Sequence, residues 1–148
     1  MGENRGFWKF FLATAAGGVL LVVLVFVSRP VARSGAVAFA QANLRATADA
    51  AERIADEAGS LSAPTALRMR DEAGLDDLLF IDPDTASNDS EIVSVWATED
   101  AWTGAARSDT GECFWVRLEG AAERVLGTGT DCSAEEASEA PPGGWPEP

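Results

Sequence analysis

The feature that most constrains this chain is an uncharged apolar run near its N-terminus. The run covers residues 10–27 (FFLATAAGGVLLVVLVFV), eighteen in all. As an α-helix it would be about 27 Å long, close to the thickness of the hydrocarbon core of a bilayer. Trp8 and Lys9 border it on one side, and Arg29 followed by Pro30 on the other. The sequence therefore predicts a transmembrane helix over residues 10–27 after a short cytoplasmic leader, residues 1–9.

Two other structures are compatible with such a run. One is a helix buried in the core of a soluble domain, but the run is long and unbroken for that. The other is a secretory signal removed at the small residues of segment 32–36 (ARSGA). Pro30 and two arginines crowd that segment, so a retained membrane helix is the preferred interpretation.

The net charge of −13 is unevenly distributed. Residues 1–35 hold four basic side chains and one acidic side chain, a net of +3, which leaves −16 for the rest of the chain. A domain with this much negative charge does not bind the phosphates of a nucleic acid. Basic residues flank the apolar run on both sides and do not decide its orientation. Because both cysteines lie in the C-terminal part and favour an oxidising compartment, we expect a single-pass protein of the cell membrane with a cytoplasmic N-terminus and an extracellular C-terminal domain.

The chain has no histidine. This excludes His-dependent catalytic triads, imidazole metal sites and histidine general bases. Ser108 and Cys113 thus have no imidazole to activate them, and no pair of carboxylates shows a spacing typical of a glycosidase. We therefore expect neither an enzyme nor a site for a small-molecule substrate, and no cofactor other than the calcium ion considered below.

Residues 28–59 have the periodicity of an amphipathic helix. Apolar and small side chains recur every three or four residues, and charged residues fall on other faces. The apolar positions are Val37, Ala40, Leu44, Ala48, Ala51, Ala55 and Ala58. Gly59 is typical of a helix end. Because the stripe is mostly alanine, it suits a closely approaching neighbour. That neighbour is the helix's own domain, with a coiled-coil partner as the alternative.

Residues 60–132 predict a small α+β domain. A short helical turn is expected within residues 64–73. Runs rich in β-formers follow at residues 79–81, 92–96, 102–108, 113–118 and 124–126. Ser108-Asp109-Thr110-Gly111 is typical of a hairpin turn. We expect four or five short antiparallel strands packed on the long N-terminal helix.

Cys113 and Cys132 have 18 residues between them. This spacing fits neither a redox pair nor a metal knuckle. Outside the cell it predicts a disulfide that closes a C-terminal loop and stabilises the fold by about 3 kcal/mol. Two free buried thiols are the alternative. Residues 133–148 form an acidic Pro/Gly-rich tail, expected to be extended and partly mobile, with Trp145 either docked on the domain or left for a partner.

An acidic segment lies at residues 82–91 (DPDTASNDSE). Calcium takes six to eight oxygen ligands, and Asp82, Asp84, Asp89 and Glu91 are the candidate ligands. The segment lacks the central glycine and regular spacing of an EF-hand loop. A solvated acidic turn is the alternative interpretation.

The order of parts resembles a type IV pilin or pseudopilin, closest to the pilin-like proteins of high-GC Gram-positive bacteria. The resemblance covers roughly residues 36–148. It is carried by residues 102–108 (WTGAARS), 111–116 (GECFWV) and 127–132 (GTGTDC) and by the late Trp145. It implies that these segments form the final strands and the disulfide-bridged loop. It also implies a structural protein of a type IV pilus or secretion-type filament, whose partners are membrane lipid and other pilin-like subunits.

The N-terminus matches this family in part. Pilin precursors are cleaved between a glycine and a phenylalanine, and Gly6-Phe7 reproduces that junction. The family expects a glutamate at the fifth residue after the cut, where this chain has Phe11, and Lys9 adds a charge. Without that carboxylate a buried charge partner is missing, which fits a minor pilin or pseudopilin better than a major subunit. The alternative is an uncleaved single-pass membrane protein whose extracytoplasmic binding or accessory domain does not polymerise.

Overall fold

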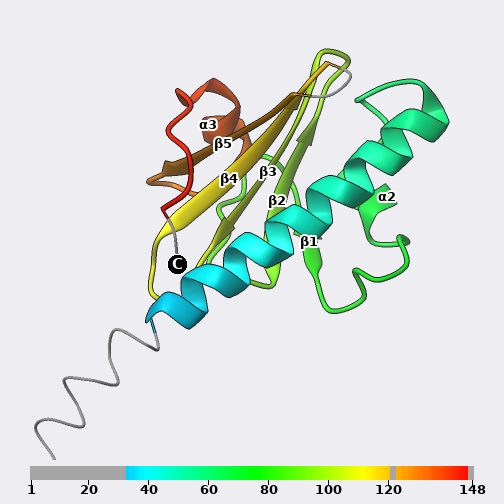
Figure 1. Cartoon of the computed structure of the whole chain (residues 1–148). Helices are drawn as coiled ribbons and strands as arrows, with labels where there is room; N and C mark the ends of the chain where they lie inside the picture. Colours follow the sequence, from blue (N-terminus) through cyan, green and yellow to red (C-terminus); the bar gives the residue numbers. More distant parts are fainter. Residues whose placement is uncertain (1–32, 121–122, 147–148) are drawn as a thin grey trace, which may run out of the picture. The chain divides into compact units, whose positions relative to one another are not determined.

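A computed structural model describes residues 33–120 and 123–146 of the chain (Figure 1). The part from Gly35 onward is one compact unit. An α-helix, here called the long helix, spans residues 33–58. The elements that follow it are α2 (Ala66–Met69), β1 (Leu79–Ile81), β2 (Ile92–Ala97), β3 (Ala101–Arg107), β4 (Cys113–Glu119), β5 (Glu123–Gly129) and α3 (Ala134–Glu139).

The long helix packs on the sheet of its own domain, as its alanine-rich stripe predicts. The predicted stripe is buried from Val37 to Ala55, whereas Ala58 in the last turn is exposed. Ile54 is also buried, so the buried side of the helix is wider than the sequence pattern indicated. Gly59 ends the helix with a φ of +73°, a conformation that favours glycine, and the amide of Ser60 donates to the carbonyl of Ala55 at 3.1 Å.

The five strands form one sheet in the order β1-β2-β3-β4-β5. The neighbours from β2 to β5 pair antiparallel, but β1 pairs parallel with β2. The prediction of a purely antiparallel sheet is therefore wrong for β1, and the sheet is mixed. The physical reason is the connection: residues 82–91 are too long for a tight hairpin and carry the chain back to begin β2 beside the start of β1, with Leu79 opposite Ile92.

Both faces of the central strands are covered. On one face Trp102, Phe114 and Val116 belong to the core that includes the buried side of the long helix. On the other face Ala105 and Trp115 pack against Ala137 of α3. Figure 1 shows the long helix crossing the sheet, and α3 contacts β2, β3 and β4. This double burial explains why β3 and β4 are apolar almost throughout instead of alternating.

Chain segment 133–146 is more ordered than its composition predicts. Ser133 caps α3 by accepting a hydrogen bond from the amide of Glu136 at 3.2 Å. An extended tail is therefore wrong for Ala134–Glu139. Residues 140–146, here called the strap, run from α3 back toward the long helix (Figure 1). Trp145, a residue of the strap, is docked on β4 and β5 of the domain, which confirms the first of the two interpretations of this residue.

The outermost strands each have a main-chain group with a partner from outside the sheet. The guanidinium of Arg70 donates two hydrogen bonds to the carbonyl of Phe80 in β1, at 3.2 and 2.6 Å. At the other edge, the amides of Gly143 and Gly144 both donate to the carbonyl of Leu126 in β5. At each edge one carbonyl is thus bonded to another part of the same chain.

Among the described residues, no helix is apolar over a length that would cross a bilayer. The predicted leader, the predicted transmembrane helix over residues 10–27 and the Gly6-Phe7 junction all lie outside the residues that the structure describes.

Candidate interaction surface

The side of the long helix that faces away from the sheet changes character along its length. In the N-terminal half it presents Gly35, Phe39, Ala42 and Ala46, here called the apolar helix stripe. All four are exposed, and Phe39 keeps 48 % of its surface accessible. They are spaced four, three and four residues apart, which places them on one side of an α-helix. The stripe therefore offers small side chains and one aromatic ring on a surface where a second helix can approach closely.

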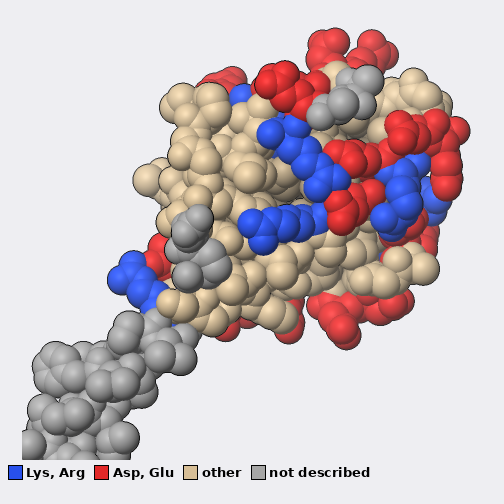
Figure 2. All heavy atoms as spheres, in the orientation of Figure 1, with Lys and Arg blue, Asp and Glu red and all other residues tan. Residues whose placement is uncertain are grey.

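The same side is charged in the C-terminal half of the long helix. Asp49, Arg53 and Asp56 are exposed there and continue the spacing of the stripe. Figure 2 shows charged side chains gathered toward this half, with arginine and acidic side chains next to one another. Arg53 bonds to Glu72 at 3.2 Å, which ties the helix to the segment after α2.

Arg124 of β5 joins the sheet to the long helix through two carboxylates. Its Nε donates to Oε1 of Glu52 at 2.6 Å, and its Nη2 donates to Oδ1 of Asp49 at 2.6 Å and to Oε2 of Glu52 at 2.5 Å. The hydrogen bonds to Glu52 raise the pKa of Arg124 above its usual value; partial burial opposes this and Asp49 adds to it. The guanidinium reduces the repulsion between two carboxylates that lie about one helical turn apart, and the group keeps a net charge of −1.

A hollow of about 350 Å³ lies beside this group, where the long helix ends near the β4–β5 turn. Its described lining is apolar at Ala55, Leu61 and Leu118. The carboxylates of Glu52, Asp56, Glu99 and Glu123 also line it, without a basic residue among the described lining. The described lining is therefore acidic, although one of its four acidic residues, Glu52, is already bonded to Arg124.

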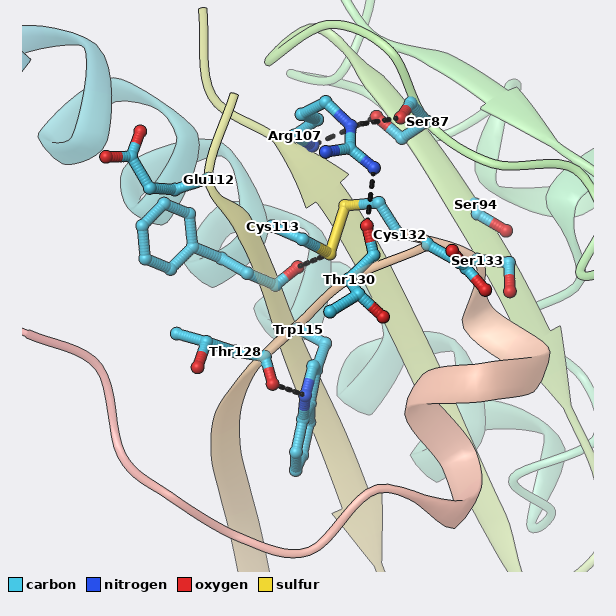
Figure 3. Close-up of a disulfide and its surroundings, with 12 residues drawn as sticks. Ser87, Ser94, Arg107, Glu112, Cys113, Trp115, Thr128, Thr130, Cys132 and Ser133 are labelled. Carbon is cyan, nitrogen blue, oxygen red and sulfur yellow. Dashed lines mark hydrogen bonds between the residues drawn. A yellow bond between two sulfur atoms is a disulfide. The ribbon is translucent and has the colours of Figure 1, made fainter. Parts of the chain in front are cut away.

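The predicted disulfide is confirmed: Cys113 at the start of β4 is bonded to Cys132, with 5.3 Å between the Cα atoms. Both residues are buried. Figure 3 shows the bond beside Arg107, which lies opposite Cys113 in the β3–β4 register. The guanidinium of Arg107 donates to the carbonyls of Ser87, Gly111 and Thr130 at 3.2, 2.9 and 2.9 Å. One arginine thus holds three loops around the disulfide.

The candidate calcium ligands are exposed side chains. Asp82, Asp84, Asp89 and Glu91 all lie on the surface. Asp84 accepts a hydrogen bond from the hydroxyl of Thr85, and Asp89 accepts one from the amide of Glu91 at 2.9 Å. Within residues 33–120 and 123–146, no three Asp, Glu, Cys or His side chains lie close enough to hold one metal ion.

The loop that carries these carboxylates is instead held by its buried serines. The hydroxyl of Ser87 donates to the carbonyl of Ile92 at 2.7 Å and accepts from the amide of Arg107 at 3.0 Å. The hydroxyl of Ser94 donates to the carbonyl of Asp82 at 3.1 Å and accepts from the amide of Ala134 at 2.9 Å. Loop 82–91 therefore owes its conformation to hydrogen bonds within the fold.

Three arginines that organise these surfaces were missed by sequence reasoning. Arg107 holds the loops around the disulfide, and Arg124 binds the long helix. Arg117 donates to the carbonyls of Ala137, Ser138 and Ala140, where α3 ends. The available signal was an arginine in each of the predicted strands 102–108, 113–118 and 124–126, because a guanidinium that becomes partly buried needs acceptors.

Comparisons with protein-family models, with curated proteins and with solved structures found no match to this chain.

Proposed function

We propose that this chain is a membrane-anchored, pilin-like structural protein, a minor pilin or pseudopilin of a type IV pilus or secretion-type filament. In this proposal residues 10–27 hold the protein in the membrane or pack among the helices of other pilin-like subunits. The acidic domain is displayed outside the cell. The work of the protein is packing and display, with no chemical step.

The observation that carries this proposal is the polarity of the long helix. One side is buried on the domain, while the other side is apolar at Gly35, Phe39, Ala42 and Ala46 and charged from Asp49 onward. The apolar part is the part nearest in sequence to residues 10–27. A helix with this distribution suits close packing against other helices near the membrane and contact with water farther along the chain.

The domain itself suits display. Its disulfide and the loops that Arg107 holds stiffen the end of the sheet against unfolding outside the cell. The net charge of −16 on residues 36–148 favours solubility and makes like domains repel, and the apolar helix stripe offers a surface for attraction between copies.

The alternative function is that of an uncleaved single-pass protein with an extracytoplasmic accessory domain. The residues that favour it are Phe11, where the pilin pattern has glutamate, and Lys9. The two functions differ in what happens at Gly6-Phe7. A pilin-like subunit is cleaved there, whereas a solitary anchor keeps its leader.

Mass spectrometry of the N-terminus of the native protein separates the two functions. We expect a mature chain that begins at Phe7 and is N-methylated. Replacement of Gly6 by valine should leave the leader attached, while the matched change at Gly2, also in the leader, should leave maturation unaffected. A native chain that always begins at Met1 or Gly2 contradicts the pilin-like function and favours the solitary anchor.

A further inference from the structure

One side chain of the strap, Trp145, contacts three elements of the domain. The indole Nε1 of Trp145 donates to the carbonyls of Trp115 and Gly127 at 3.0 and 3.1 Å. Its ring meets Phe114 edge-to-face at 6.3 Å between centroids, and the guanidinium of Arg45 lies 5.0 Å above it. These partners come from β4, β5 and the long helix. They form a receptor for an indole, here called the Trp145 seat.

The rest of the strap is exposed and is held through main-chain hydrogen bonds. Pro141, Pro142, Gly143 and Gly144 are exposed, and Pro142 and Gly144 line an open hollow of about 600 Å³ together with side chains of β4 and β5. The remaining attachments are made through the strap's main chain. The amides of Gly143 and Gly144 donate to the carbonyl of Leu126, the side chain of Gln41 donates to the carbonyl of Pro146, and that of Arg117 donates to the carbonyl of Ala140. Release of the indole removes the aromatic contacts of the strap and two of its hydrogen bonds.

The chemistry of the seat selects an indole but not the molecule that carries it. Two main-chain carbonyls require an N–H donor on a flat apolar ring, and the cation of Arg45 favours an electron-rich face. None of these contacts depends on the covalent link between the strap and α3. The link supplies a high local concentration of the strap, in the millimolar range for a short connection. Another strap at comparable concentration competes on equal terms.

We propose that the Trp145 seat also binds the strap of a second copy of this chain, so that neighbouring domains exchange straps. A second copy carries the same Trp145 on the same Pro-Gly segment, and exchange of an identical element creates no new contact and loses none. The exchanged strap therefore makes the same contacts as the chain's own strap, and exchange occurs wherever copies are held close together, as on a membrane or in an array. The proposal holds for a filament subunit and for a solitary anchored protein alike.

A peptide experiment tests whether the seat accepts a strap from outside. The probe is a fluorescent peptide of residues 138–148, SEAPPGGWPEP, added to the full chain in detergent micelles. Binding is measured by anisotropy. We expect the Trp145→Ala chain, whose own strap leaves the seat empty, to bind the peptide at least tenfold more tightly than the wild-type chain. A peptide with alanine in place of tryptophan should bind neither chain.

Two outcomes of this experiment overturn the proposal. One is equal binding to both chains, which places the peptide elsewhere on the surface. The other is no binding to a Trp145→Ala chain that retains the near-ultraviolet circular dichroism of a folded domain. A second experiment uses chains that keep Trp145, so it tests the proposal even when the Trp145→Ala chain does not fold.

The second experiment traps an exchanged strap covalently. The side-chain amide of Gln41 lies 3.0 Å from the carbonyl oxygen of Pro146, so cysteines at these positions approach one another when the strap is docked. Gln41→Cys chains are mixed with Pro146→Cys chains, so that a bond between these positions forms only between two copies. The control mixture pairs Pro146→Cys with Leu67→Cys, because Leu67 is 72 % exposed on α2, away from the seat.

Peptide mapping after mild oxidation reads out the bonds that form. We expect the bond between positions 41 and 146 to form at least fivefold faster than the bond between positions 67 and 146, although position 41 is buried and position 67 is exposed. Addition of the strap peptide should slow the first bond and leave the second unchanged. Equal rates in the two mixtures, or a slower bond at position 41, overturn strap exchange.

Discussion

The indole of Trp115 occupies the space above Gly127, its partner residue on β5. A Cβ atom on Gly127 would lie 2.1 Å from Cζ2 of Trp115, far inside the contact distance of two carbon atoms. The indole is fully buried, and its Nε1 donates to the carbonyl of Thr128 at 3.1 Å. Gly127 is therefore required by packing, because its φ is not in the left-handed region.

Replacement of Gly127 by alanine should destabilise the fold by about 1–3 kcal/mol, because Trp115 has to move within a filled core and loses its hydrogen bond. Urea unfolding of the full chain, followed by tryptophan fluorescence, measures this loss. Gly129→Ala is the matched control on the same strand, since a Cβ there would lie 3.6 Å from Sγ of Cys113, an ordinary contact. A Gly127→Ala chain as stable as the control would contradict the packing described.

Loss of the disulfide should cost about 3 kcal/mol, because the unfolded chain gains the freedom of the loop between Cys113 and Cys132. The Cys113→Ser, Cys132→Ser double variant and the reduced wild-type chain should unfold at similar, lower urea concentrations. Reductant should leave the double variant unchanged. Peptide mapping without reductant that finds free thiols at both positions would contradict the pairing.

Replacement of Arg124 by glutamine should destabilise the domain by about 1 kcal/mol or less, since the bonds to Asp49 and Glu52 are partly exposed to solvent. The loss should shrink as salt is added. Because the folded state raises the pKa of Arg124, its stabilising contribution is complete below the usual arginine pKa and is lost only at strongly alkaline pH. The difference between wild type and variant should therefore stay constant from neutral to mildly alkaline pH.

The control for Arg124 is Arg53→Gln, which removes a single ion pair, with Glu72, where the Arg124 variant removes two. We expect a change close to zero there. An Arg53 variant that loses more stability than the Arg124 variant would show that the sheet-to-helix bonds contribute little.

Replacement of Phe39 by glutamate should abolish co-purification of copies that carry different affinity tags, while the fold is retained, because the side chain is half exposed and the charge would lie in the apolar helix stripe. The measurement is the amount of one tagged copy that co-purifies with the other after cross-linking in intact membranes. Leu67→Glu is the matched control, since this leucine is more exposed but lies on α2. Loss of association in both variants, or in neither, would contradict helix packing through the stripe.

We expect calcium to give no saturable heat in titration calorimetry of the full chain. The four carboxylates of loop 82–91 are exposed, and the loop is shaped by Ser87 and Ser94. The measurement extends to millimolar calcium, with magnesium as the reference. A saturable calcium signal that disappears in an Asp84→Asn, Asp89→Asn variant would establish the calcium site instead.

Much of the fold follows from local patterns. The hairpin turn at residues 108–111 forms as predicted, with Gly111 at a φ of +95° and its amide donating to the carbonyl of Ser108 at 2.8 Å. The buried alanine-rich side of the long helix follows from the periodicity of its apolar residues. The disulfide follows from the oxidising compartment expected for this domain. The turn and the helix depend on residues close in sequence, and the disulfide has one possible pairing because the chain has two cysteines. Sequence alone therefore predicts these features.

Other features depend on distant partners and were missed. The direction of β1 is decided by how loop 82–91 returns over the sheet, and no strand pattern encodes that. The helix α3 carried a usable signal, the Ser133-x-x-Glu136 cap, beside proline and glycine that suggested an extended chain. The roles of Arg107 and Arg124 depend on carbonyls and carboxylates up to 75 residues away in sequence.

The occupied sheet edges have a consequence for crowding. Arg70 takes up a carbonyl of β1 and the strap takes up a carbonyl of β5, so a strand from a neighbouring molecule can pair at these positions only after Arg70 or the strap has left. Exposed, unpaired edges are the usual template for cross-β growth. In the proposed array of such domains, these two contacts therefore oppose the change from close packing of folded units to edge-to-edge strand pairing.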